Sequence, residues 1–514
     1  MDLSPLGIST ATLPSAVPAQ HCQVSSGQLL NACRLAWERG GVLAALWASD
    51  ERDRGRGYGV NVALRNDDGL LLLEYTLPDA DAGCPDLATI FPAANRMQRA
   101  AFDLVGVQSD SDDQRPWLWQ ASWPIDQYPL RREFAASPKW EPGEEDYPFV
   151  RVEGDGVHEI PVGPVHAGII EPGHFRFQVV GEKVLRLEER LGYVHKGIEK
   201  RFEALGFVDG ARLAGRVSGD STVAYAWAYA QAAEAIAGVA PPPRAAWLRA
   251  LALERERIAN HLGDLGALGN DGGFAFGLAQ FSRLREDVLR TNAELFGHRL
   301  LMDQVVPGGV VLDLAPAATA AIRDECARLE REIRRLHDIY DDHAGLQDRF
   351  RTCGRVTPAL AARLGLTGFA GRASGQARDA RCDFPAAPYD ALAVRAAAHT
   401  DGDVAARVVV RFDEALESLR LSRGIVDALP PGGCRIDLPV PPAHRTGLGY
   451  VEGWRGPVLM ALTTGPEGTI RRCHPHDPSW SNWPVLEHAV IGNIVPDFPL
   501  INKSFNLSYS GHDL

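Results

Sequence analysis

Two carboxylates in apolar stretches of this sequence are positioned for proton chemistry. Glu199 falls in the middle of an apolar-periodic stretch, which predicts a buried carboxyl group paired with Arg216 or His195. Such a group is either half of a structural ion pair or a member of a proton relay. Asp220 directly precedes a predicted helix, where it either caps the free N–H groups or presents a titratable carboxylate to a pocket. Both alternatives remain open for each residue.

Cysteine and histidine are common metal ligands, but in this sequence they do not occur at the spacing that metal sites use. The eight cysteines include no CxxC pair, so neither a zinc ribbon nor an iron–sulfur site is expected. The run Cys473-His474-Pro475-His476 suggests a soft-metal cluster, yet its proline and its place at a strand end favour a surface turn. His166 and His174 flank an apolar, extended stretch, where they satisfy backbone groups or line a cavity.

The composition limits the classes of partner. A net charge of −13 excludes nonspecific nucleic-acid binding, because phosphate contacts need a basic surface. The first twenty residues contain no Lys or Arg and no long apolar core, so no signal peptide is predicted. The most apolar stretch, 221–240, contains Gln231 and Glu234 and predicts a buried helix rather than a membrane span. We expect a cytoplasmic chain with reduced thiols that meets a membrane only through partner subunits.

The N-terminal part contains the signals of a small α+β domain. Hairpin and strand signals predict strands over 41–48, 59–64 and 70–76, followed by a helical segment over 86–106 with a break at Pro92. The whole length allows two or three domains. We expect an N-terminal extension over 1–26, the α+β domain over 27–135, an acidic Pro/Gly-rich linker over 136–160 and a large domain over 161–514.

The large domain is predicted to be mainly helical, with β segments at its start and end, and the fold class is therefore α+β. An extended stretch over 162–177 leads to a hairpin at Gly181-Glu182, and another strand is expected over 458–464. Apolar residues at i, i+3, i+4 spacing predict helices over 185–205, 221–237, 245–268, 283–300, 315–340 and 401–429. A helical core of this size favours binding sites between facing helices.

Motifs in the large domain resemble those of two related families of redox subunits. The segments 163–166 (GPVH) and 171–177 (EPGHFRF) resemble the opening of group 4 nickel–iron hydrogenase large subunits. They are similar, more loosely, to the opening of the quinone-site large (49-kDa-type) subunit of complex I. Further matches follow in the families' order: 195–200 (HKGIEK), 257–262 (RIANHL), 306–310 (VPGGV), 372–375 (RASG), 378–379 (RD) and 451–456 (VEGWRG). The resemblance implies that 161–514 has the large-subunit fold of these families.

The N-terminal domain resembles the small (30-kDa-type) subunit of complex I. The segment 128–134 (YPLRREF) closely matches the ending of that family. The segment 91–106 resembles its conserved helix, although Arg96, Gln98 and Arg99 replace the family's usual polar pattern. The chain therefore resembles a fusion of the two complex I subunits.

The chemistry implied by the resemblance depends on four cysteines that this chain lacks. In nickel–iron hydrogenases, four thiolates hold the metals: two from an early CxxC motif and two from another near the C-terminus. Soft donors are required there. Here Ser218 and Ser221 stand at the early positions, and 499–509 contains no cysteine. A serine hydroxyl stays protonated near neutral pH and does not replace a thiolate. The resemblance is closest to the energy-converting hydrogenase-related complexes, and we expect no bound metal and no hydrogenase activity.

The resemblance to complex I also suggests a quinone site. There, a His, a Tyr and an Asp lie at the mouth of the corresponding cavity. By position, His174 matches the histidine and Asp271 matches the aspartate. The tyrosine position holds Gly219, with Tyr225 nearby in sequence.

From the resemblance we expect a peripheral large subunit on the cytoplasmic face of the inner membrane. Its partners would be a small iron–sulfur subunit, which carries the clusters, and the integral membrane subunits of a complex I-like arm. It would couple electron transfer, with quinone as a candidate acceptor, to ion translocation. Glu199 and Asp220 are the candidate working residues. The alternative is a non-catalytic scaffold that docks the iron–sulfur and membrane modules.

Overall fold

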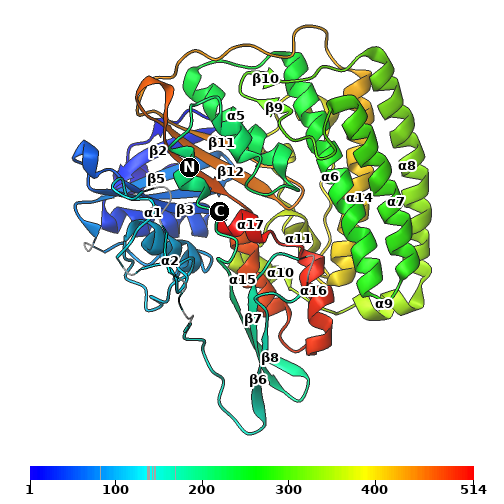
Figure 1. The fold of residues 1–514 in the computed structure, drawn as a ribbon, viewed down its shortest axis with the longest axis horizontal. Helices are drawn as coiled ribbons and strands as arrows, with labels where there is room; N and C mark the ends of the chain where they lie inside the picture. The colour runs from blue at the N-terminus through cyan, green and yellow to red at the C-terminus, as the bar shows by residue number, and fades with distance from the viewer. Residues whose placement is uncertain (81–82, 125, 136–138, 142, 144–145, 168–169) are drawn as a thin grey trace.

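The computed structural model describes residues 1–80, 83–124, 126–135, 139–141, 143, 146–167 and 170–514. Figure 1 shows a blue N-terminal α+β part, a bundle of long helices on the opposite side, and a small sheet that projects below them. The C-terminus lies near the middle of the view, close to the N-terminal part. The α+β fold class predicted from the sequence is confirmed.

The N-terminal part is a five-stranded sheet with the order β1-β2-β5-β4-β3. The predicted strands and hairpins are present as an antiparallel meander, and β2 pairs with β5 in parallel. Residues 1–26 do not form a separate extension, because β1 and β2 complete this sheet. Without β2, strand β5 would be the edge of the sheet and its backbone groups would be unpaired. Its residues Leu70–Leu73 are buried on both faces, and β2 covers this edge. The elements are β1 (Ala11–Thr12), β2 (Ala19–Val24), α1 (Ser26–Glu38), β3 (Val42–Asp50), β4 (Tyr58–Asn66), β5 (Gly69–Leu77) and α2 (Ala94–Val105).

Most of the long helices lie within a few residues of those predicted from apolar spacing, but the helix predicted over 283–300 is found at 275–296. Pro243 and Pro316 open two of them, at positions where the missing N–H costs nothing. Gly238 and Gly297 end two others in the left-handed conformation. The four helices of the bundle and the helix before them are α5 (Thr222–Ala237), α6 (Pro243–Asp271), α7 (Ala275–Phe296), α8 (Pro316–Asp342) and α14 (Val404–Asp427).

The helix predicted over 185–205 is wrong. The segment contains strand β8 (Lys183–Arg190) and the short helix α3 (Ile198–Phe202) instead. Two glycines, Gly192 and Gly197, separate them with φ of 96° and 65°, which a right-handed helix does not accommodate. The hairpin at Gly181-Glu182 is confirmed, since it joins β7 (His174–Val180) to β8. Strand β6 (Val157–Val162) pairs with β7 and begins inside the expected linker.

A C-terminal sheet, β11-β12-β13, lies between the helices and the N-terminal sheet. Its strands are β11 (Thr446–Glu452), β12 (Pro457–Thr464), which the sequence predicted, and β13 (Ile470–His476). Helix α5 packs closely against β11: a Cβ added at Gly449 would lie 1.7 Å from the carbonyl oxygen of Ala228, so only glycine fits. The remaining short elements are α4 (Gly210–Ala214), β9 (Val305–Val306), β10 (Gly309–Val310), α9 (Ala344–Phe350), α10 (Pro358–Leu364), α11 (Gly368–Ala373), α12 (Ala380–Asp383), α13 (Tyr389–Leu392), α15 (Ser479–Ala489), α16 (Phe498–Phe505) and α17 (Tyr509–Asp513).

The two predicted domains share one interior. Leu13, Ala45 and Trp47 of the N-terminal sheet pack in a common cluster with Leu448 and Leu459 of the C-terminal sheet. Ion pairs cross the same seam, from Arg471 to Glu51 and Asp53 and from Arg65 to Asp383. The resemblance to two separate subunits therefore does not imply two independently packed bodies.

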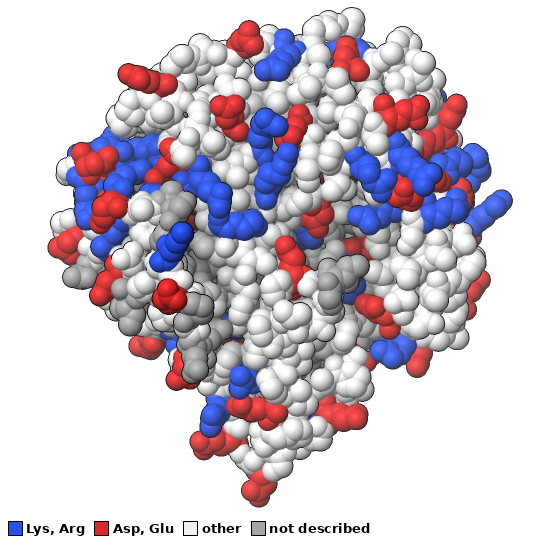
Figure 2. Space-filling view, viewed as in Figure 1, with Lys and Arg blue, Asp and Glu red and all other residues white. Residues whose placement is uncertain are grey.

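The expected linker over 136–160 is docked where it is described; 136–138, 142, 144 and 145 lie outside the described residues. Trp140 stacks on Trp123, and the hydroxyl of buried Tyr147 accepts a hydrogen bond from Arg99 at 2.6 Å. Within the described residues, none of the helices is long and apolar enough to cross a membrane. On the face shown in Figure 2, Lys and Arg side chains are interspersed with Asp and Glu.

Candidate functional site

Asp220 forms an ion pair with Arg455 at the point where the loop before α5 meets the turn between β11 and β12. Two guanidinium nitrogens of Arg455 lie 2.8 and 2.5 Å from the two carboxylate oxygens, a bidentate geometry. Arg455 is buried, whereas about 36% of the Asp220 side chain is exposed. Burial raises the pKa of Asp220, but the adjacent guanidinium more than offsets this and lowers the pKa to about 2. Asp220 is therefore a fixed negative charge at neutral pH.

The serines of the early motif contact a serine near the C-terminus. The Ser218 hydroxyl donates to Asp220 at 2.8 Å and lies 2.9 Å from the Ser508 hydroxyl. Ser221 is 3.3 Å from Arg455. The two chain segments that correspond to the two ligand motifs of the resembling hydrogenases therefore meet here. Ser508 was not singled out from the sequence, because nothing local marks it among the polar residues of 499–509.

Gly511 lies three residues after Ser508, which is the CxxC spacing, and its N–H donates to the Ser508 hydroxyl at 2.8 Å. A Cβ added at Gly511 would lie 2.5 Å from a carboxylate oxygen of Asp477. That carboxylate accepts a hydrogen bond from buried Tyr225 at 2.6 Å. The space beside Gly511 is thus filled by a carboxylate–tyrosine pair.

The expectation that Asp220 caps α5 is wrong. Ser221 occupies the N-cap position and makes no side-chain cap. Instead, Glu256 of α6 accepts hydrogen bonds from the N–H groups of Val223 at 2.7 Å and Ala224 at 3.3 Å. Burial raises the pKa of Glu256 to about 8. Sequence analysis missed this titratable group, because its position on α6 is defined only by the packing of α6 against α5.

Glu199 is a buried carboxylate held by an arginine and a histidine of β13. Its Oε1 lies 2.6 Å from Arg472 and 2.7 Å from Nδ1 of His474. The expected partners are wrong: Arg216 pairs with Asp303, and the His195 ring contacts the backbone of Asp513. Burial raises the pKa of Glu199, but Arg472 and His474 outweigh it and lower the pKa to about 2.

The run 473–476 is not a surface turn. It lies in β13, where Cys473, His474 and His476 are all buried. Strand β13 is at the edge of its sheet, which is where a proline such as Pro475 is tolerated. The His474 ring stacks on Trp47 of the N-terminal sheet, with centroids 4.9 Å apart. This contact, which the sequence does not reveal, makes the segment part of the seam.

The pKa of Glu199 predicts an acid-dependent component of stability. Because the folded pKa is depressed from an unfolded value near 4.5, the contribution is complete above pH 4.5 and is lost as pH falls towards 2. The shift corresponds to about 3 kcal/mol. We expect Glu199→Gln to be destabilised relative to the unmodified chain at pH 7, with the difference shrinking below pH 4.5. Urea unfolding at several pH values measures this, with Glu182→Gln, at an exposed turn, as the control. A difference that stays constant down to pH 3 would contradict it.

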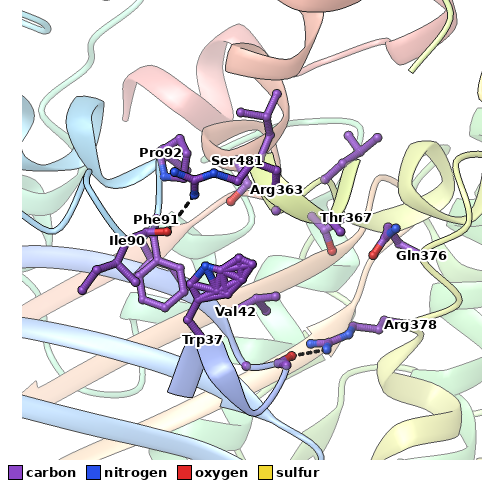
Figure 3. A pocket seen from close by; sticks show the side chains of 18 of the residues that line it. Trp37, Val42, Ile90, Phe91, Pro92, Arg363, Thr367, Gln376, Arg378 and Ser481 are labelled. Atoms are coloured by element: carbon purple, nitrogen blue, oxygen red, sulfur yellow. Dashed lines mark hydrogen bonds between the residues drawn. The ribbon is translucent and has the colours of Figure 1, made fainter. Parts of the chain in front are cut away.

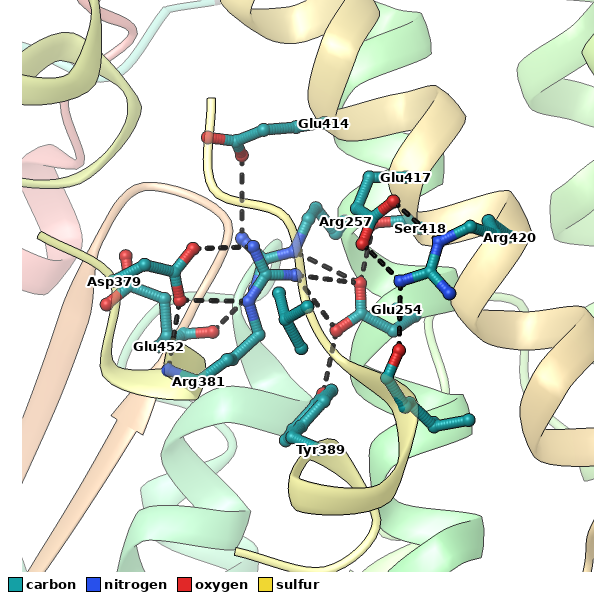
Figure 4. Close-up of polar contacts among 12 residues, drawn as sticks. Glu254, Arg257, Asp379, Arg381, Tyr389, Glu414, Glu417, Ser418, Arg420 and Glu452 are labelled. Carbon is teal, nitrogen blue, oxygen red and sulfur yellow. Dashed lines mark hydrogen bonds and ion pairs between the residues drawn. The ribbon is translucent and has the colours of Figure 1, made fainter. Parts of the chain in front are cut away.

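Other motif residues belong to a buried ionic network, and Figure 4 shows the part of it around Glu254, Arg257 and Arg381. Arg372 donates to Glu414 at 2.7 Å and to Glu452 at 2.8 Å, and all three are buried. Arg381 bridges Asp379 and Glu254 at 2.7 and 3.1 Å. The remaining members are Arg257, His261, Tyr389 and Ser418. Charged motif residues of the large domain therefore hold helices α6 and α14 to β11 and the loop around α12.

The two candidate quinone-site residues lie on different elements. His174 begins β7, where its ring contacts the carbonyl oxygen of Gly163 and the guanidinium of Arg176. Asp271 is the exposed last residue of α6. Tyr225, by contrast, belongs to the polar cluster beside Ser508 through Asp477.

Comparison with known protein families accounts for most of the chain. The family described as the respiratory-chain NADH dehydrogenase 30 kDa subunit matches residues 22–139, and the one described as the 49 kDa subunit matches 271–447. The chain is 32% identical to formate hydrogenlyase subunit 5 of Escherichia coli K12, over 93% of this chain and 86% of that protein. It is 32% identical to the carbon monoxide-induced hydrogenase of Rhodospirillum rubrum, over 68% and 97%. The fused C/D polypeptide of the NADH-quinone oxidoreductase of Bacteroides fragilis is 28% identical, over 76% and 77%.

A solved structure agrees in fold. A chain of the membrane-bound sulfane sulfur reductase, an archaeal respiratory membrane complex, superposes with a TM-score of 0.66 at 24% identity, covering 70% of this chain and 99% of that one. The chain therefore belongs to the family that contains the group 4 hydrogenase large subunits and the fused 30 kDa–49 kDa subunits of complex I. This confirms the resemblance identified in the sequence. Its members are subunits of membrane-bound hydrogenase and complex I-like assemblies.

Proposed function

We propose that this chain is a metal-free large subunit of such an assembly and that its Asp220–Arg455 pair occupies the place of a nickel–iron centre. In this proposal the chain links electron transfer to ion translocation without itself being a hydrogenase. The observation that carries the proposal is the meeting of Ser218 and Ser508 around a bidentate carboxylate–guanidinium pair.

The donors at the site support the absence of the metals. Three hydroxyls and a glycine stand at the positions of four thiolates, and hydroxyls are hard, protonated ligands near neutral pH. The pair also carries a cation, Arg455, which would repel a divalent metal. The cysteine that would restore a ligand at position 511 would meet Asp477.

We expect the purified assembly to contain no nickel bound to this chain and to show no hydrogen uptake or evolution. Nickel is measured by mass spectrometry after growth with added nickel. The matched variant carries Ser218→Cys and Ser221→Cys, which restores the early motif alone; it too should remain inactive, because residues 508 and 511 supply no thiolate. The detection of about one nickel per chain in the unmodified protein would contradict the proposal.

The proposed partners are a small iron–sulfur subunit, which would deliver electrons near the exposed edge of Asp220, and integral membrane subunits. The relatives support the membrane part of this proposal, since their names include a membrane-bound hydrogenase and NADH-quinone oxidoreductases. We place the assembly on the cytoplasmic face of the inner membrane. Within the site, Asp220 supplies a fixed charge and Glu256, with its pKa near 8, supplies a group that takes up and releases a proton at neutral pH.

We propose quinone as the electron acceptor. His174 lines a cavity of about 520 Å³ with Tyr147, Phe149 and Arg176, but Asp271 does not line it. A quinone headgroup there would be held by His174 and Arg176 rather than by the His–Asp pair inferred from position.

The alternative is a scaffold role, and one observation favours it. The motif residue Arg372 forms ion pairs with two other motif residues, Asp379 and Glu452, inside the buried network, which is an arrangement that stabilises an interior. The two functions differ in whether the charges of Asp220 and Arg455 are needed once the assembly has formed.

A further inference from the structure

A cavity of about 220 Å³ opens at the seam between the N-terminal domain and the large domain (Figure 3). The N-terminal domain contributes Trp37, Val42 and Phe91 to its lining, and the large domain contributes Arg363 and Arg378. In Figure 3 the aromatic side chains of Trp37 and Phe91 lie on one side and the two arginines lie above and below them. Neither Asp220 nor Arg455 lines the cavity, although Gly368, which does line it, packs against the backbone of Arg455.

The lining combines apolar surface with positive charge. Its side chains include an indole, a phenyl ring, a proline and several aliphatic groups, together with the two guanidinium groups. None of the described residues that line it is an aspartate or glutamate, although the whole chain has 66 acidic against 53 basic residues. A cavity with this lining favours a ligand that has an apolar body and a negative charge.

Arg378 has unused hydrogen-bonding capacity. Its Nη2 donates to the carbonyl oxygen of Gly40, while Nη1 is buried and has no hydrogen-bond partner among the described residues. The carboxylate of Asp383, close in sequence, is engaged by Arg65 at 2.6 Å. Burial lowers the pKa of Arg378, which reflects a guanidinium with little solvation. A buried donor of this kind is costly unless an acceptor reaches it.

Arg363 presents the second cation from the opposite side. One of its nitrogens donates to the carbonyl oxygen of Ile90 at 2.9 Å, which holds the side chain across the seam. The rest of the guanidinium is exposed, because Arg363 lies on the surface of α10. It can contact a ligand's anionic group without losing its own structural bond.

The volume sets the size of the apolar body. A cavity of roughly 150 Å³ lined by aliphatic and aromatic groups holds one benzene, so this one has room for one or two fused rings. We propose that the cavity binds a small amphipathic anion: a planar apolar ring system with a carboxylate or similar group that pairs with Arg378. The ring lies against Trp37 and Phe91, and the anionic group pairs with the guanidinium groups of Arg378 and Arg363.

A ligand here would contact both domains at once and would strengthen their association. Its binding free energy would add to the stability of the folded chain in proportion to ligand concentration. The association of the two domains would therefore become stronger as the concentration of the aromatic acid rises. This inference is independent of whether the proposed metal-free function is correct.

The test uses the full chain in its assembled complex and isothermal titration with naphthoate. The neutral analogue naphthylmethanol has the same rings without the charge. We expect naphthoate to bind at one site per chain and at least about tenfold more tightly than naphthylmethanol. Arg378→Gln should weaken naphthoate at least about tenfold and leave naphthylmethanol little changed. Arg290→Gln, at an exposed arginine of α7, is the matched control and should bind both as before.

A second variant separates binding from loss of fold. Ala362→Trp fills the cavity from its rim without removing a cation, and should abolish binding of both ligands while thermal unfolding stays unchanged. Equal affinity for naphthoate and naphthylmethanol would overturn the proposal, as would naphthoate binding that survives both Arg378→Gln and Ala362→Trp. So would a structure of the complex in which a side chain from a neighbouring protein fills the cavity.

Discussion

Replacing Arg372 by methionine is expected to destabilise the folded chain by about 3–5 kcal/mol. The substitution keeps most of the side-chain volume but leaves the carboxylates of Glu414 and Glu452 in the interior without their shared cation. All three residues are almost completely buried, and breaking a buried ion pair by removing one partner costs about this much. Pulse proteolysis in urea, followed on the band of this chain, measures the change.

The matched control for this prediction is Arg290→Met. Arg290 forms an i, i+4 pair with Glu286 on α7, and its side chain is about 75% exposed. A pair in that position contributes about 0.3–0.5 kcal/mol, so the control should barely differ from the unmodified chain. Equal destabilisation by the two substitutions would mean that Glu414 and Glu452 find other partners, with Arg257 and His261 as the nearest candidates for Glu414.

Replacing Asp220 by asparagine is expected to lower electron-transfer-linked ion pumping by the assembled complex at least about tenfold. Asparagine preserves the shape of the side chain but removes its negative charge. That charge pairs with Arg455 and helps to raise the pKa of Glu256. Because Asp220 is partly exposed, the stability loss should be about 2 kcal/mol or less, below the cost for a fully buried pair. Pumping is measured in vesicles, with assembly checked on native gels. Asp303→Asn, in the surface pair with Arg216, is the control.

A double variant separates the coupling function from the scaffold. Asp220→Leu with Arg455→Met removes both charges and keeps an apolar pair of similar volume, which commonly restores stability. If the pair takes part in coupling, the double variant assembles but still fails to pump. Normal pumping by both Asp220→Asn and the double variant would establish the scaffold function instead.

Local sequence signals, such as apolar spacing and the positions of prolines, predicted helices and strands well where the structure depends mainly on neighbouring residues. The helices opened by Pro243 and Pro316 and the strand over 458–464 were predicted within a few residues. The helix over 185–205 failed because apolar spacing was extended across Gly192 and Gly197, whose positive φ angles depend on the tertiary structure.

The candidate site was predicted only in part, because its partners are remote in sequence. Ser218, Ser221 and Asp220 do lie together, but Arg455 comes from 235 residues away and Ser508 from 290. The Arg472 partner of Glu199 is 273 residues away. Periodicity contains no information about such pairs. Nearby cations such as Arg216 were therefore chosen in error.

The shared interior of the two domains has a consequence for how the chain is made. The apolar face of the N-terminal sheet, including Trp47 and Leu72, is covered by β11 and β12. Strand β5 ends at Leu77 and β12 ends at Thr464, about 390 residues later. At about 5–20 residues per second, a ribosome needs about 20–80 s to synthesise that stretch. During this interval the nascent N-terminal sheet presents an uncovered apolar face. Until β11 and β12 have been made, this face is open to chaperones and to other nascent chains.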